Sequence, residues 1–125
     1  MNDIPYQNIF DALQEVLPRQ WHKVVFCVEY GESSYSMKYF VDLGDGEYIE
    51  CFKLDGIPKH NIIRSFALID SLIMPARRDL TKKDTWSVMT LSVDENGNLK
   101  ADYEYDDISE EPIEYHNIWK KKHLR

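Results

Sequence analysis

The chain has 125 residues, of which 43% are apolar, and its 22 acidic and 15 basic residues give a net charge of −7. This length suits one domain with its own core, and the apolar content excludes wholesale disorder. The negative charge argues against nucleic acid or an anionic membrane as a direct partner, because both attract basic faces. A basic partner fits the composition better.

The two cysteines, Cys27 and Cys51, are too few for a disulfide framework and belong to no CxxC pair. The first residues, MNDIPYQNIF, lack the basic start and apolar run of a signal peptide. No stretch approaches the roughly 20 apolar residues of a membrane helix. We therefore expect reduced thiols and a cytoplasmic location.

Helical patterns occur in three parts of the chain. Apolar residues recur at helical spacing over residues 4–17, where Asp3 is the expected N-cap and Pro18 the expected stop. The stretch KHNIIRSFALIDSLIMP predicts a second helix over residues 59–74, ended by Pro75. The last segment, PIEYHNIWKKKHLR, opens with a proline and gathers its bases at the end, where the helix dipole favours them. It predicts a third helix.

Runs of β-branched and aromatic residues predict strands. HKVVFCVEYG and SYSMKYFVDLG form an expected hairpin, and GDGEYIECFKL continues it into a meander through the Asp45-Gly46 turn. TWSVMTLSVDENGNLKADYEYDD predicts a second hairpin, whose Asn96-Gly97 suits a type I′ turn. The expected fold class is α+β: a single domain over residues 1–125, with N-terminal, middle and C-terminal helices packed on an antiparallel sheet of about five strands. Strand order and oligomeric state stay open.

The second strand of the last hairpin alternates strictly between apolar and charged residues. Tyr103 and Tyr105 fall on one face, whereas Asp102, Glu104 and Asp106 fall on the other. Because the apolar face must point to the core, the acidic row is expected to point to solvent. Three further acids follow closely in the chain: Asp107, Glu110 and Glu111.

No motif in the sequence assembles a catalytic or metal site. It contains neither a GxSxG nor an HExxH motif, and its four histidines are scattered. His116 and His123 share a predicted helix but are separated by roughly 10 Å of rise, too far for one zinc ion. An exposed row of carboxylates stays ionised, which suits binding better than proton transfer. We therefore expect no catalysis, no metal and no cofactor.

The C-terminal third resembles the ending of the YezG-like immunity (antitoxin) proteins of bacterial polymorphic toxin systems. In that family a tryptophan opens a strand, a glycine turn leads to an acidic-aromatic strand, and a Trp-Lys helix closes the chain. The matching positions are Trp86, Gly97, Asp102, Tyr103, Tyr105, Asp106, Trp119, Lys120 and Leu124. The closing helix departs from the family pattern at Lys121-Lys122-His123, where aromatic residues usually stand between the lysines.

The resemblance implies a protein without catalysis that binds the toxic C-terminal domain of a cognate toxin, often a nuclease, in the cytoplasm of the producing cell. A nuclease holds phosphates on a basic surface, which an acidic inhibitor can cover. The expected contacts are the acids Asp102, Glu104, Asp106, Asp107, Glu110 and Glu111, with aromatic anchors among Phe40, Tyr48 and Tyr115. Two other classes stay open: an adaptor module for another basic partner, and a small enzyme.

Overall fold

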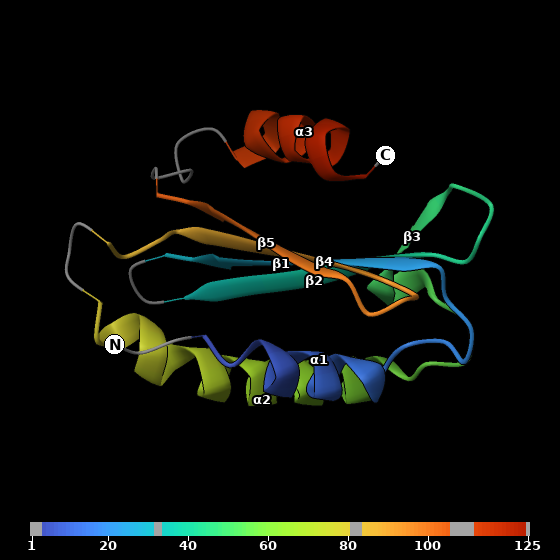
Figure 1. Ribbon diagram of the computed structural model, residues 1–125, viewed down its shortest axis with the longest axis horizontal. Helices are drawn as coiled ribbons and strands as arrows, with labels where there is room; N and C mark the ends of the chain where they lie inside the picture. The colour runs from blue at the N-terminus through green and yellow to red at the C-terminus, as the bar shows by residue number, and fades with distance from the viewer. Residues whose placement is uncertain (1–3, 32–33, 81–83, 106–111, 125) are drawn as a thin grey trace. The chain divides into compact units, whose positions relative to one another are not determined.

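The computed structural model describes residues 4–31, 34–80, 84–105 and 112–124 (Figure 1). Contacts within the chain divide it into two compact units. The helical unit comprises Met1–Arg19 and Cys51–Thr85, and the sheet unit comprises Gln20–Glu50 and Trp86–Arg125. The sheet unit is therefore built from two stretches of sequence, which are separated by the Cys51–Thr85 stretch of the helical unit.

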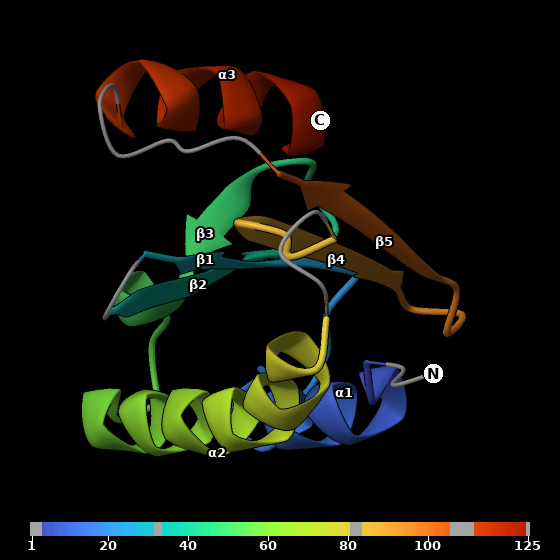
Figure 2. The same cartoon turned by 90° about the vertical axis from the view of Figure 1, so that its left-hand side faces the viewer.

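The helical unit contains two α-helices that run side by side (Figure 2). These are α1 (Tyr6–Gln14) and α2 (Lys59–Arg78), and a short 3-10 helix, η1 (Cys51–Lys53), precedes α2. The buried side chains of α2 recur every three or four residues and form one stripe along the helix. They are Ile62, Ser65, Phe66, Ile69, Ile73 and Ala76.

The first helix is shorter than the predicted range of 4–17, since α1 begins after Pro5 as N-cap and ends at Gln14. The predicted cap, Asp3, lies outside the described residues. Beyond the helix, the amide of Val16 donates to the carbonyl of Leu13 at 2.9 Å. A bond that spans three residues tightens the backbone out of the α-helical path, so the helix ends before Pro18 is reached.

The prediction that Pro75 ends the second helix is wrong, because α2 continues to Arg78. Pro75 lies on the exposed side of α2, where water can replace the hydrogen bond that its missing N–H leaves unmade. One residue further on, Ala76 is only 7% exposed and extends the buried stripe. Packing of this last turn offsets the local cost of the proline.

The sheet unit holds five antiparallel strands in the order β3-β2-β1-β4-β5. The strands are β1 (Lys23–Tyr30), β2 (Tyr35–Asp42), β3 (Tyr48–Glu50), β4 (Val88–Asp94) and β5 (Leu99–Glu104). The last helix, α3 (Pro112–His123), lies over one face of this sheet (Figures 1 and 2). The predicted α+β class, with an antiparallel five-stranded sheet and N-terminal, middle and C-terminal helices, is confirmed.

Side-chain carboxylates close two of the hairpin turns of the sheet, the one between β2 and β3 and the one between β4 and β5. Asp42 Oδ1 accepts hydrogen bonds from the backbone amides of Gly44 and Gly46 at 2.8 and 3.1 Å. Both bonds lower the pKa of Asp42, and the bond from Gly44 has the larger effect. Asp94 accepts the backbone and side-chain amides of Asn98, which likewise lower its pKa.

The predicted type I′ turn at Asn96-Gly97 is wrong, because only the glycine has a positive φ. The Gly97 amide donates to the Asp94 carbonyl at 3.0 Å, so the chain turns over four residues and returns to the ladder through Gly97 at φ 86°. This is the longer hairpin loop built on a type I turn, in which one left-handed residue is sufficient.

Candidate functional site

Alternate residues of all five strands form the face that α3 covers, here termed the α3 face. Its members are Lys23, Val25, Cys27, Glu29, Ser36, Lys38, Phe40, Asp42, Tyr48, Glu50, Val88, Thr90, Ser92, Asp94, Lys100, Asp102 and Glu104. More than half of these side chains are polar or charged. The opposite face of β1 is wholly apolar apart from Tyr30, and its Val24, Phe26 and Val28 are at most 1% exposed.

One tryptophan supplies the apolar attachment of α3 to this face. Trp119 is 5% exposed, and its indole Nε1–H donates to Thr90 Oγ1 at 2.9 Å. Its ring lies with its centroid 5.5 Å from that of Phe40. Tyr48 and Tyr115 pack against the same cluster. The structure thus gathers all three predicted aromatic anchors around Trp119, although they come from β2, β3 and α3.

Polar contacts supply the rest of the attachment. The Tyr115 hydroxyl donates to Glu104, and His116 Nε2 lies 2.5 Å from Glu29 Oε1. Asp102 Oδ2 lies 3.1 Å from Lys122 Nζ and 3.5 Å from His123 Nε2. Carboxylates of β1 and β5 are therefore matched by hydroxyl, imidazole and ammonium groups of α3.

The alternating pattern predicts that the acids of β5 face open solvent, but Asp102 and Glu104 lie on the sheet face that α3 covers. Asp102 and Glu104 are both half-buried. Tyr103, on the opposite face, lies with its ring centroid 5.6 Å from that of Trp86, whereas Tyr105 follows the end of β5 and is 57% exposed. The alternation correctly separates the two faces, but the charged face is covered by the chain's own basic helix.

Two titratable groups under α3 are shifted by their surroundings. Burial lowers the pKa of His123, while Asp102 acts in the opposite direction and Lys122 in the same one. Burial raises the pKa of Tyr115, and its hydrogen bond to Glu104 raises it further. At neutral pH the Tyr115 hydroxyl thus keeps its proton and remains a donor to the Glu104 carboxylate.

The structure places the predicted contact residues unevenly. Asp102 and Glu104 lie on the α3 face, whereas the remaining predicted acids, Asp106, Asp107, Glu110 and Glu111, lie outside the described residues. Among the predicted anchors, Phe40 is only 6% exposed, so little of its ring is available to a partner. Tyr48 and Tyr115 are half-buried.

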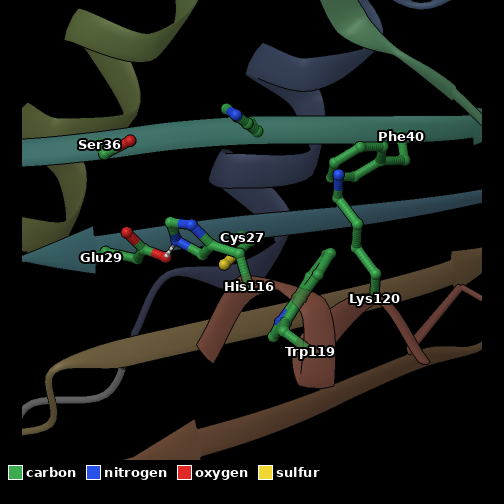
Figure 3. A pocket seen from close by; sticks show the side chains of 8 residues that line it. Cys27, Glu29, Ser36, Phe40, His116, Trp119 and Lys120 are labelled. Atoms are coloured by element: carbon green, nitrogen blue, oxygen red, sulfur yellow. Dashed lines mark hydrogen bonds and ion pairs between the residues drawn. The ribbon is translucent and has the colours of Figure 1, made fainter. Parts of the chain in front are cut away.

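A cysteine, a histidine and a carboxylate meet beside Trp119. These are the residue types that form a thiol nucleophile with its base. Cys27, His116 and Glu29 all line the same hollow (Figure 3). A reactive thiol needs a lowered pKa, however, and burial strongly raises the pKa of Cys27, with Glu29 adding to the shift. The hydrogen bond between Cys27 and Thr90 acts in the opposite direction and lowers this pKa, but burial outweighs it. The arrangement favours packing and recognition over nucleophilic chemistry.

Within the described ranges, no group of three or more His, Cys, Asp or Glu side chains is arranged to hold a metal ion. Both cysteines are free thiols. A search of the same residues finds no helix long and apolar enough to cross a bilayer.

The α3 face thus combines a buried aromatic centre with charged groups around it. Residues 1–125 match the family model described as "Immunity protein YezG-like", and the chain belongs to that family. Immunity protein YezG of Bacillus subtilis strain 168 is 25% identical, over 99% of this chain and 87% of its own length. Immunity protein YezG of Bacillus spizizenii strain W23 is 25% identical, over 86% of this chain and 70% of its own. Membership supports an immunity, or antitoxin, role with a cognate toxin as partner.

Proposed function

We propose that this protein neutralises its cognate toxin by binding the toxin's C-terminal domain, a nuclease, in the cytoplasm of the producing cell. The toxin is of the polymorphic kind delivered between neighbouring bacteria in contact. Membership of the immunity family over the whole length of the chain carries the proposal. The protein acts by covering a basic surface of the toxin and catalyses no reaction itself.

The net charge of −7 supports the basic character of the target, since opposite fields accelerate association. We assign the contact to the acids of β5, Asp102 and Glu104, and to those that follow in the chain, Asp106, Asp107, Glu110 and Glu111. The side chain of Asp102 keeps 35% of its surface exposed while it pairs with α3. Its carboxylate can therefore hold the helix and also contribute to the field that a basic partner meets.

Co-expression with the toxin domain encoded beside this chain tests the proposal directly. We expect the toxin domain alone to degrade nucleic acid and stop growth, and the pair to restore growth and to purify as a complex. Raising the salt from roughly 0.05 to 0.5 M shortens the Debye length from about 14 to 4 Å, and association should slow accordingly. A toxin whose activity this protein leaves unchanged would rule the proposal out.

Two substitutions that change the net charge in opposite directions test whether the acidic row contacts the toxin or only holds α3. Asp102→Asn and Lys122→Gln both remove the ion pair between these two residues, and Asp102→Asn also removes the charge that faces His123. They shift the charge in opposite directions. If the row meets a basic toxin, Asp102→Asn slows association by about threefold at low salt and Lys122→Gln speeds it by a similar factor.

The matched controls lie in the helical unit, where Asp55→Asn and Lys53→Gln make the same charge changes at exposed positions. We expect them to alter the association rate less than the changes at Asp102 and Lys122. Equal slowing by Asp102→Asn and Lys122→Gln would show that the acidic row only supports the helix.

A further inference from the structure

The α3 face is hollowed beside Trp119, between α3 and the first two strands (Figure 3). We call this cavity of about 130 Å³ the Trp119 pocket. Its lining residues are Cys27, Glu29, Ser36, Lys38, Phe40, His116, Trp119 and Lys120. Every one of them belongs to the sheet unit.

The volume of the Trp119 pocket limits what it can hold. Sites for cofactors and drug-sized ligands span roughly 300–1,000 Å³, well above this cavity. An apolar cavity of about 150 Å³ accommodates a single benzene ring. The pocket is therefore matched to one large side chain.

Two aromatic rings and a thiol form the apolar part of its lining. Phe40 and Trp119 are both about 95% buried, and each is held by the other's ring. Cys27 contributes a thiol that burial keeps protonated and uncharged.

The rim of the pocket carries the opposite charge to the protein as a whole. Lys120 is exposed, and half of the Lys38 side chain is exposed, with only a 4.0 Å contact to Glu50. Glu29, the acid of the rim, already lies against His116. An incoming group thus meets two ammonium groups around an aromatic cavity, in a protein of net charge −7.

We propose that the Trp119 pocket receives a large apolar side chain of the toxin that is flanked by a carboxylate, which pairs with Lys120 and Lys38. This inference rests on the proposed function and names the partner's chemistry at its surface. In this arrangement Phe40 forms one wall of the Trp119 pocket, and the anchoring side chain comes from the toxin. Pockets of this kind, filled at the centre of an interface and ringed by polar groups, concentrate binding energy.

Filling the pocket tests its part in binding. Ser36 is exposed at the rim, so Ser36→Trp places an indole in the cavity without removing a core side chain. We expect at least about a 30-fold loss of affinity for the toxin domain, the size typical of a lost hot spot. Ser71→Trp, at an exposed serine of α2, is the matched control and should bind as the parent does. Circular dichroism and melting curves establish that both variants fold.

Charge reversal at the rim separates the pocket from general electrostatics. Lys120→Glu makes the protein more acidic, and a basic toxin should then bind more tightly if overall charge alone decides. The pocket predicts the opposite, a loss of about tenfold, because the partner's carboxylate loses its ammonium and meets a like charge. Lys53→Glu, the same change at an exposed position of the helical unit, should bind as tightly as the parent or more tightly.

The results distinguish failure of the pocket from failure of the proposed function. If the parent protein does not bind the toxin domain, the proposed function itself is wrong. If the parent binds but Ser36→Trp and Lys120→Glu retain its affinity, the toxin uses another surface and the pocket inference is overturned.

Discussion

The two helices α2 and α3 are attached to their units in contrasting ways. α2 buries a stripe of mostly apolar side chains along its 20 residues. Among the described residues of α3, only Trp119 is buried, and Tyr115 packs beside it while partly exposed. The polar contacts of α3 are hydrogen bonds and ion pairs from Tyr115, His116, Lys122 and His123.

The contrast sets how each helix responds to its surroundings. Burial of a continuous apolar stripe is insensitive to salt and to modest changes of pH. Partly exposed ion pairs contribute roughly 0–1 kcal/mol each and are screened by salt. We therefore expect α3 to detach in a local opening, at a free energy below that of global unfolding.

The largest expected effect comes from removing Trp119, the one buried side chain among the described residues of α3. Trp119→Ala should cost about 3–5 kcal/mol, the usual range for a buried tryptophan. The amides of α3 should then exchange with solvent almost without protection, while those of β1 and β2 stay protected. Hydrogen exchange read by mass spectrometry measures both. Equal loss of protection in β1 would show that α3 and the sheet open together.

The matching change in α2 is Ile69→Ala, at a fully buried position of the stripe. It should cost about 2–5 kcal/mol and leave a cavity whose neighbours still hold the helix. We expect reduced but continuous protection along α2. Loss of α2 alone, as in the α3 variant, would remove the proposed difference between the helices.

A smaller effect is expected from the hydrogen bond between Tyr115 and Glu104. Tyr115→Phe leaves the ring in place but removes the donor, which should cost about 1 kcal/mol and speed exchange in α3. Tyr105→Phe makes the same chemical change at an exposed ring and should alter stability by less than about 0.5 kcal/mol. Indistinguishable variants would mean that this bond adds nothing to the attachment.

The mildest perturbation is a change of pH. The pKa of His123 lies below its ordinary 6.5 because burial disfavours the charged ring. Between those two pKa values the unfolded chain binds more protons than the folded one, so stability falls as the pH falls below 6.5. Melting curves of the parent and His123→Gln over this range isolate the contribution. An equal pH dependence in both would show that His123 does not couple α3 to pH.

Local patterns in the sequence predict the strands and their pairing well. Alternation within KADYEYDD separates the two faces of β5, and a glycine turn joins β5 to β4 as expected. Alternation gives no information about which element covers a face, however. The basic end of α3 and the acids of β5 are each explained locally, by the helix dipole and by solvation, and only the fold shows them in contact through Asp102.

The Trp119 pocket lies further beyond what the sequence can predict. It needs Cys27 of β1, Phe40 of β2 and Trp119 of α3 in one place, and no local rule sets the distance between a strand and a helix so far apart in the chain. The one available signal is the spacing of Tyr115, Trp119 and His123, which places them on one flank of α3. That spacing predicts a buried side of the helix but not the hollow beside it.

The division of the sheet unit into two stretches of sequence affects how fast it can assemble. β1 pairs with β2 across a short connection, but Val24 also pairs with Val93 of β4, although β2, β3 and the Cys51–Thr85 stretch of the helical unit lie between them in the chain. Pairing over such a separation must first overcome the entropy of closing the loop, which slows folding. Early formation of the α1–α2 pair would shorten the effective loop. The β1–β4 ladder is accordingly the step that we expect to limit the folding rate.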